Sequence, residues 1–292
     1  MKVKVYTHPT YSYITVAEIP RSEISKIDVA VCKQPKETLE EYNVRQTKKP
    51  DVLINGGFFA LSTGETVFTL VDDGTEYSVD PNYVDGIGIY GDADIQFSKY
   101  DHAGSFRDFI CGYPVLVKNG KPFSSDVGSE LNYKARRSVF GFNHDTVWIV
   151  TIDAPGMAYS AMKKLMIKLG ATFAINLDGG GSTRMIANGK TYAAAASSRA
   201  VDSVLAVYLK ENKRVLYRVQ IGAFTRESNA IALRDKIRAL NDNIGAGYKN
   251  AYVRLINGLY KVQVGAFSTK RSAELVAENL SIHGYTCYVT SE

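Results

Sequence analysis

A strand, a helix and a second strand follow one another between residues 147 and 178, and this unit constrains the fold of the 292-residue chain more than any other stretch. Residues 147–153 and 171–177 are short apolar runs of the kind that form buried strands. Between them, apolar side chains recur at helical spacing from Met162 to Leu169, and Gly170 ends the helix. Such a crossover is right-handed, so the two strands should run parallel if they belong to one sheet.

Both apolar runs lead to an aspartate, the first to Asp153 and the second to Asp178. In open sheets, ligands bind at the edge formed by the carboxyl ends of parallel strands, so we expect both carboxylates at a binding edge. The plainer alternative is that the two aspartates cap loops. Three glycines follow Asp178 and let the backbone come close to whatever this carboxylate faces. A flexible hairpin turn is the alternative interpretation of these glycines.

The loop after Asp178 can also bind an anion, because successive unhindered backbone N–H groups form a concavity that attracts negative charge. The polar side chains that follow the glycines add further donors. The donors expected in this loop are Gly179, Gly180, Gly181, Ser182, Thr183 and Arg184.

Other polar groups stand at the ends of predicted strands. A short apolar run ends in Asn55 and two glycines, which predicts an amide and exposed backbone at a pocket wall, or else a turn before a core anchor. Arg136 and Arg137 begin a later strand. Since neighbouring strand residues face opposite ways, at most one of these arginines lines a given pocket. Arg199 precedes the strand that closes this part of the chain.

The composition is that of a globular protein, with 45% hydrophobic and 22% charged residues. The three cysteines and four histidines are scattered, so neither a disulfide framework nor a zinc cluster is encoded. The N-terminus has no apolar signal segment and no later run reaches the length of a membrane span, so we expect synthesis in the cytoplasm and no membrane partner. The whole formal net charge of +5 falls on the residues from Glu211 onward, so a small basic module follows a neutral body.

The chain repeats itself beyond a charged linker at residues 210–214. The sequence Tyr-Arg-Val-Gln-Ile-Gly-Ala-Phe at residues 217–224 recurs as Tyr-Lys-Val-Gln-Val-Gly-Ala-Phe at residues 260–267. Each copy is followed by a helical pattern and another strand. This order predicts a βαββαβ module with two helices on one face of its sheet and the other face open.

Five motifs of the first two hundred residues occur together in the order typical of one family. They are residues 54–59, 112–120 and 137–141, the strand that ends at Asp153, and residues 176–183. Through them, residues 45–209 resemble the phosphodiester glycosidase family, which includes the enzyme that uncovers mannose 6-phosphate by removing N-acetylglucosamine from a phosphodiester. The chain departs from the family's usual pattern at Ala154, where glycine is common, and at Ser203, where asparagine is common.

The doubled Gln-hydrophobic-Gly-Ala-Phe motif is similar to that of sporulation-related repeat (SPOR) domains, and the similarity covers residues 215–292. A SPOR domain implies binding to peptidoglycan glycan strands, particularly strands stripped of their peptides. The residues that the resemblance implies for this binding are Gln220, Phe224, Gln263 and Phe267. A ferredoxin-like RNA-binding module is the alternative, but the central strands lack its aromatic signature, so no nucleic acid partner is expected.

These patterns and resemblances predict an α+β protein of two domains. A mixed-sheet catalytic domain with a βαβ unit takes residues 1–209. The linker of residues 210–214 then leads to a small βαββαβ, ferredoxin-like SPOR domain at residues 215–292.

The first resemblance implies a glycosidase that acts on a sugar attached through phosphate. Phosphate is a good leaving group, so the reaction depends less on a general acid than ordinary glycoside hydrolysis does. We hypothesise that Asp178 is the nucleophile or base at the anomeric carbon and that Arg137 and Arg199 bind the phosphate. Asp153 would be the carboxylate partner of Asp178, or the two would share a divalent cation, Ca²⁺ or Mg²⁺, which oxygen ligands suit. Asn55 would orient a sugar hydroxyl. Further contacts with the substrate are expected from Gly56, Gly57, Gly179, Gly180, Gly181, Ser182 and Thr183.

The pairing of the two domains predicts a hydrolase that cleaves a sugar 1-phosphodiester of the N-acetylhexosamine class in bacterial cell-wall glycopolymers. The expected partners are peptidoglycan glycan strands and wall glycopolymers. The expected place of action is the cell wall, reached after lysis or by a non-classical route. Two alternatives stay open: a lysin that cleaves peptidoglycan strands, of a phage or a sporulating mother cell, and a non-catalytic peptidoglycan-binding protein. The presence of Asp153, Asp178 and Arg137 argues against the last.

Overall fold

The computed structural model describes residues 2–33, 36–101, 106–123, 132–192, 199–211, 215–240 and 247–291. The chain divides into two compact units, Met1–Lys210 and Glu211–Glu292, and the division falls within the charged segment taken above as a linker. Of that linker, residues 212–214 lie outside the described ranges. No helix within those ranges has the length and apolar character needed to span a membrane.

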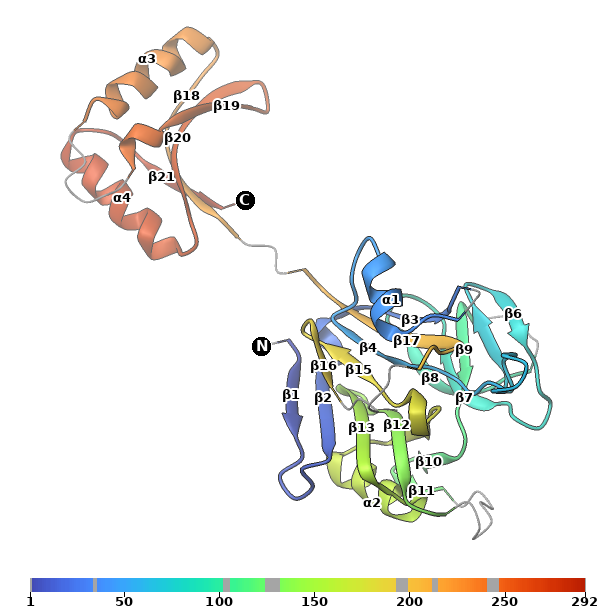
Figure 1. Ribbon diagram of the computed structural model, residues 1–292. Coiled ribbons are helices and arrows are strands. Elements are labelled where there is room, and N and C mark those ends of the chain that lie inside the picture. The colour runs from blue at the N-terminus through green and yellow to red at the C-terminus, as the bar shows by residue number, and fades with distance from the viewer. Residues whose placement is uncertain are drawn as a thin grey trace. The chain divides into compact units, whose positions relative to one another are not determined.

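The described strands of the first unit form three antiparallel sheets (Figure 1). The largest has the order β1-β2-β13-β12-β14-β10-β11 and consists of β1 (Lys4–Thr7), β2 (Ile14–Pro20), β10 (Val115–Lys118), β11 (Lys121–Pro122), β12 (Ala135–Phe142), β13 (Thr146–Met157) and β14 (Phe173–Asn176). The second has the order β16-β15-β4-β17-β3 and consists of β3 (Ile24–Val31), β4 (Val52–Asn55), β15 (Met185–Ala187), β16 (Lys190–Tyr192) and β17 (Ser203–Leu209). The third has the order β6-β5-β9-β7-β8 and consists of β5 (Leu70–Asp72), β6 (Thr75–Ser78), β7 (Asp85–Ile89), β8 (Ile95–Lys99) and β9 (Asp108–Cys111).

The main hydrophobic core of this unit draws buried side chains from all three sheets, among them Phe140, Ile54 and Ile87. Helix α2 (Tyr159–Leu169) covers the outer face of the largest sheet with its apolar stripe, and helix α1 (Leu39–Arg45) packs in the same way on the second sheet. The unit thus packs three sheets around one core, with α2 on the outer face of the largest sheet and α1 on that of the second. This architecture belongs to the predicted α+β class.

The crossover that the sequence predicts is formed by β13, α2 and β14. Both strands pair antiparallel with β12, which lies between them, so β13 and β14 run in the same direction within one sheet. The prediction that they are parallel is confirmed, although the two strands are not hydrogen-bonded to each other, because β12 lies between them. Asp153 lies late in β13 and Asp178 lies just beyond the end of β14. Asp178 therefore follows the carboxyl end of its strand, as expected, whereas Asp153 lies within β13, which continues to Met157.

The second unit has the predicted βαββαβ order (Figure 1). Its elements are β18 (Tyr217–Phe224), α3 (Glu227–Arg238), β19 (Tyr252–Ile256), β20 (Leu259–Phe267), α4 (Lys270–Ile282) and β21 (Tyr288–Ser291). The sheet order is β19-β20-β18-β21, so the two strands that carry the repeated motif are the central pair. Val219 and Val264 of these strands enter one core with Ile237 of α3 and Leu280 of α4, so both helices cover the same face of the sheet.

Candidate active site

Segments that lie far apart in the sequence meet at the loop after β14. The Asp178 N–H donates to the Gly56 carbonyl (3.1 Å), and the Leu177 N–H donates to the carbonyl of Ser138 in β12 (2.8 Å). The Asn55 side-chain amide donates to the Asp178 carbonyl (2.6 Å). The backbone that carries the Asp178 carboxyl is therefore fixed from both β4 and β12.

Asn55 anchors this loop from beneath. Its side chain is fully buried, and its Oδ1 accepts hydrogen bonds from the Ser138 hydroxyl (2.6 Å) and from the Arg184 N–H (3.3 Å). These hydrogen bonds do not support the predicted role of Asn55, which was to orient a sugar hydroxyl. Because its amide already joins three backbone or side-chain groups of the protein, Asn55 is a positioning residue for the Asp178 loop.

Asp178 supplies a carboxyl group whose basicity the protein increases. Its side chain is half-buried, and its Oδ1 accepts a hydrogen bond from the Gly179 N–H (2.8 Å). Burial raises the pKa of Asp178, while the nearby Ser182 hydroxyl, the Gly179 N–H and the positive charge of Arg199 act in the opposite direction. A partly desolvated carboxylate of raised pKa beside a cation is suited to act as a nucleophile or general base.

Arg199 reaches the glycine-rich loop, as the sequence hypothesis requires. A Cβ atom at Gly181 would lie 2.5 Å from the Arg199 Nη2, so any larger residue there would displace the guanidinium. A Cβ atom at Gly179 would lie 2.6 Å from the Arg136 carbonyl oxygen of β12. Gly179 and Gly181 therefore allow β12 and the Arg199 side chain to approach the loop closely, which argues against the interpretation as a flexible turn. Gly180 adopts a φ of +60° at the start of a 3-10 helix (Gly180–Ser182).

Two of the backbone donors expected to bind an anion serve the loop itself. The Gly179 N–H bonds to Asp178, and the Ser182 N–H donates to the Gly179 carbonyl (3.1 Å). Gly56 and Gly57 are buried against β17, where the Gly57 N–H donates to the Ser203 Oγ (2.9 Å). The structure therefore assigns these glycines to packing and loop geometry.

Arg137 lies in an aromatic clasp. Its guanidinium donates to the Tyr159 hydroxyl (2.7 Å) and to the Tyr133 carbonyl (3.1 Å), and it lies 4.1 Å and 5.2 Å from the centres of the two rings. The pKa of Tyr159 is raised chiefly by burial, with the Arg137 charge opposing and the charge of Asp178 adding to the rise. A Cβ atom at Gly179 would lie 3.6 Å from the Arg137 Cα, so the backbone next to Asp178 passes close to Arg137 and the two residues belong to one site.

Unsatisfied donors accompany these charges. The Arg137 Nε and the Thr183 Oγ1 are buried and have no hydrogen-bond partner among the residues that the structure describes. Most buried polar atoms in proteins are paired, so orphaned donors beside a cation indicate a place for an acceptor such as a phosphate oxygen.

Asp153 has a partner other than the one expected. Its Oδ1 accepts from the Arg136 Nε (2.6 Å) and from the Ala154 N–H (2.7 Å). Arg136 and Arg137 thus take different partners, as the alternation of a strand predicts. Because a guanidinium already neutralises Asp153, the residues do not suit a cation shared with Asp178, and the described part of the chain holds no group of three or more potential metal ligands.

Three tyrosines of the site were not found from the sequence. Tyr133 and Tyr159 hold Arg137, and the Tyr113 carbonyl accepts a hydrogen bond from the Asn176 side chain (2.7 Å), two residues before Asp178. Tyr113 belongs to the Gly-Tyr-Pro motif and Tyr159 begins α2 directly after the Asp153 strand, so their positions were available as signals.

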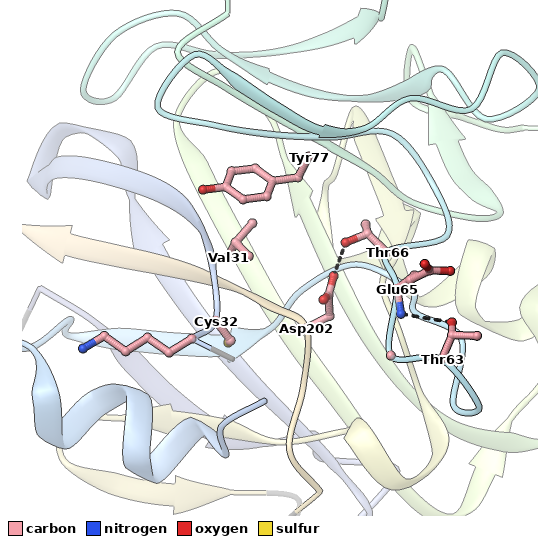
Figure 2. A pocket seen from close by; sticks show the side chains of 9 residues that line it. Val31, Cys32, Thr63, Glu65, Thr66, Tyr77 and Asp202 are labelled. Carbon is pink, nitrogen blue, oxygen red and sulfur yellow. Dashed lines mark hydrogen bonds between the residues drawn. The ribbon is translucent and has the colours of Figure 1, made fainter. Parts of the chain in front are cut away.

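A separate cavity of about 730 Å³ lies beside β17 and contains none of the predicted site residues (Figure 2). Asp202 lies at its wall, buried, and accepts hydrogen bonds from the Thr66 hydroxyl (2.6 Å) and the Lys36 ammonium (2.9 Å). Cys32 also lines it, and burial raises the pKa of this thiol to about 12, so the thiol is not a nucleophile at neutral pH. Tyr77 of β6 stands exposed at this cavity.

In the second unit, the two glutamines predicted to bind glycan lie next to each other on one face of the sheet. The two phenylalanines predicted to bind glycan lie on the opposite face. Gln220 and Gln263 are directly paired across β18 and β20, and the Oε1 of each is buried without a hydrogen-bond partner in the described chain. They alternate with Val219 and Val264 of the helix-covered core, so they point to the other face of the sheet.

The phenylalanines turn toward the helices because β-bulges interrupt the alternation. Gly265, with φ +72°, lies in one bulge, and beyond it Phe267 packs against the core of this unit. A Cβ atom at Gly222 would touch both the Phe224 ring and Leu233 of α3, which puts that ring on the helix side as well. The structure therefore gives Phe224 and Phe267 packing roles rather than the glycan contacts expected of them.

Comparison with known proteins agrees with this division. Residues 48–208 match the model of the phosphodiester glycosidase family. The chain belongs to the phosphodiester glycosidase family. Residues 213–291 match the SPOR domain, so the glycosidase domain is followed by a SPOR domain. None of the curated proteins compared with the chain matches it.

Two solved structures share the fold of the glycosidase domain, and a third solved structure matches a shorter part of the chain. The catalytic domain of zebrafish N-acetylglucosamine-1-phosphodiester alpha-N-acetylglucosaminidase, auto-inhibited by its pro-peptide, is 20% identical with a TM-score of 0.55, over 71% of this chain and 82% of that one. A hypothetical protein from Synechocystis is 12% identical with a TM-score of 0.60, over 71% of this chain and 61% of that one. The peptidoglycan-binding domain of the B. subtilis cell wall lytic enzyme CwlC is 38% identical with a TM-score of 0.24, over 28% of this chain and 96% of that one.

Proposed function

We propose that this protein is a hydrolase that cleaves a sugar 1-phosphodiester, of the N-acetylhexosamine class, in bacterial cell-wall glycopolymers. The observation that carries the proposal is the convergence of a carboxyl group of raised pKa, Asp178, with the guanidinium groups of Arg137 and Arg199. A sugar 1-phosphodiester presents an anomeric carbon next to an anionic leaving group, and the site offers a carboxylate for the first and fixed positive charge for the second.

The two arginines bind the phosphodiester and stabilise the negative charge that develops on it. The buried Arg137 Nε and Thr183 Oγ1 have no acceptor in the described protein, and phosphate oxygens would supply one. Because Tyr159 and Tyr133 hold Arg137 in place before substrate arrives, little reorganisation is needed during the reaction.

Asp178 acts at the anomeric carbon. As a nucleophile it forms a bond to this carbon while the bond between the carbon and the phosphate oxygen breaks, and the electron pair leaves with the phosphate. Water then attacks the same carbon, the bond between this carbon and the carboxylate oxygen breaks, and the proton of the water passes to the released phosphate, so that the Asp178 carboxylate is regenerated. As a base it instead takes a proton from the water that attacks. Neither route needs a second carboxylic acid to protonate the leaving group, which agrees with the engagement of Asp153 by Arg136.

The SPOR domain indicates where the protein acts. A domain of the peptidoglycan-binding kind fused to a phosphodiester glycosidase supports a substrate linked through a sugar 1-phosphate to peptidoglycan, and action at the cell wall. Peptidoglycan strands and phosphate-linked wall polymers are therefore the proposed partners.

The test uses sacculi prepared with and without their phosphate-linked polymers. Wild type and the Asp178→Asn variant are incubated with both, and released polymer and new reducing ends are measured separately. Asp145→Asn is the matched control, because this substitution makes the same chemical change at an exposed turn between β12 and β13. Polymer release that requires Asp178 and not Asp145 supports the proposal. New reducing ends from stripped sacculi would indicate a peptidoglycan lysin instead, and binding without either product would indicate a recognition protein.

A further inference from the structure

Four aromatic side chains contact one another on the first unit. The centre of the Phe68 ring lies 5.0 Å from that of Phe58 and 4.0 Å from that of Tyr83, on which Phe68 is stacked with an interplanar angle of 22°. The Tyr113 ring meets Tyr83 edge to face at 5.3 Å and 89°, and it also meets Phe68 edge to face at 6.3 Å. We call Phe58, Phe68, Tyr83 and Tyr113 the aromatic row. They come from four separate segments, after β4, before β5, before β7 and before β10.

Both ends of the aromatic row adjoin the candidate active site. Phe58 follows Gly57 directly, next to the Gly56 carbonyl that holds the Asp178 N–H. At the other end, the Tyr113 carbonyl accepts a hydrogen bond from the side-chain amide of Asn176 (2.7 Å), two residues before Asp178. The aromatic row is therefore a continuation of the site along the surface of the protein.

The aromatic row is held in place and yet remains accessible. Phe68 and Tyr83 pack at the edge of a small core that includes Val71 and Phe109. All four residues are nevertheless only partly buried, so part of each side chain remains accessible. Rigid, partly exposed aromatic rings with a phenol at one end provide an apolar face and a polar edge, which matches the two sides of a pyranose ring.

We propose that the aromatic row binds a second sugar ring of the substrate, so that the preferred substrate carries at least two sugars at its phosphodiester. This inference rests on the proposed function and adds to it the size of the substrate. The arginines and Asp178 engage the phosphate and the reacting sugar, and the aromatic row stacks on the neighbouring ring. A chain-like wall glycan provides such a ring, whereas a single sugar 1-phosphodiester does not.

The test compares three defined probes by kcat/KM. N-acetylglucosamine 1-(methyl phosphate) carries one sugar. Chitobiose 1-(methyl phosphate) adds a sugar on the side of the reacting ring, and an N-acetylglucosamine 1-phosphate ester of the glucose 6-hydroxyl adds one beyond the phosphate. For the wild type we expect at least one two-sugar probe to exceed the one-sugar probe about three- to tenfold, the range of one stacked aromatic contact. Which probe is preferred identifies the side on which the aromatic row acts.

Variants of Tyr83 separate stacking from structure. Tyr83→Leu keeps apolar volume against the core but removes the ring face, so we expect the ratio of two-sugar to one-sugar kcat/KM to fall to about one. Tyr83→Phe keeps the ring and should keep the ratio. Tyr77→Leu is the matched control, because Tyr77 is an exposed tyrosine of the same sheet that borders the separate cavity (Figure 2) and should leave the ratio unchanged.

Two results would overturn the inference while the proposed function stands: equal rates for all three probes in the wild type, or a preference that survives Tyr83→Leu. If Tyr83→Leu does not fold by circular dichroism, Tyr113→Leu replaces it, with the same expected fall in the ratio. Absence of hydrolysis of every probe by the wild type would instead overturn the proposed function and this inference with it.

Discussion

The two candidate binding regions of this protein differ in the groups that they remove from water. In the first unit, a carboxyl of raised pKa, Asp178, lies near the guanidiniums of Arg137 and Arg199. In the second unit, the face opposite the helices holds the uncharged amides of Gln220 and Gln263. A partly buried carboxylate can form a bond or accept a proton, whereas an amide can only exchange hydrogen bonds. The comparison leads us to expect that chemistry and anchoring are divided between the units, so that either property can be lost while the other is kept.

The largest effect should come from removing the carboxylate. We expect Asp178→Asn to lower kcat/KM on N-acetylglucosamine 1-(methyl phosphate) about a thousandfold or more, because neither nucleophile nor base remains. Co-sedimentation with sacculi should be unchanged, since the SPOR domain is intact. The measurement pairs steady-state kinetics with a pull-down, and equal loss of both properties would show that the division between the units is wrong.

A smaller effect is expected when the cation beside the carboxylate is removed. Arg199→Gln should lower kcat/KM about a hundredfold, the typical cost of one preorganised charge-stabilising group. The Arg199 charge lowers the pKa of Asp178, so its loss raises that pKa further. Asp178 then loses its proton only at higher pH, so the acidic limb of the pH profile of kcat/KM should move to higher pH. A limb that stays in place or moves to lower pH would separate Arg199 from Asp178.

The reverse experiment breaks the anchor and spares the chemistry. The double substitution Gln220→Ala and Gln263→Ala should weaken binding to peptide-stripped sacculi about tenfold, because two hydrogen-bonding amides are lost. Turnover of the small soluble probe should not change. Gln96→Ala, at an exposed position of β8, is the control. Undiminished binding by the double variant would move the glycan contacts to other residues of the sheet.

The smallest effect concerns stability. Because burial raises the pKa of Asp178, the ionised carboxylate destabilises the folded state at neutral pH, and protonation relieves this cost as the pH falls through that pKa. Asp178→Asn should therefore melt slightly higher than the wild type at pH 7, and the difference should shrink in acid. Thermal unfolding across pH measures this, with Asp145→Asn, at an exposed aspartate, expected to show no such trend. A variant that is less stable at pH 7 would mean that the carboxylate is held mainly by attractive contacts.

Much of the architecture could be predicted because it depends on local patterns in the sequence, namely the spacing of apolar residues and an internal repeat. The period of the apolar residues in β13, α2 and β14 predicted the crossover and the parallel direction of its strands. The repeat of β18 and β20 predicted the βαββαβ order of the second unit, since each copy is one strand of the same small sheet. The role hypothesised for Arg199 in binding the phosphate requires it near the Asp178 loop, and its guanidinium lies against Gly181 of that loop.

What the sequence by itself determined was the order of elements, the two domains and the types of charged residue at the site. Only the tertiary structure decided the partners. In the folded protein, Asp153 pairs with Arg136, and the Asn55 side chain donates to the carbonyl of Asp178. Phe267 packs against the core because of the bulge at Gly265, and four separate segments form the aromatic row. The physical reason is that periodicity fixes which face a residue takes along one element, whereas hydrogen bonds and ring contacts between distant segments depend on how the sheets pack and where bulges shift their register.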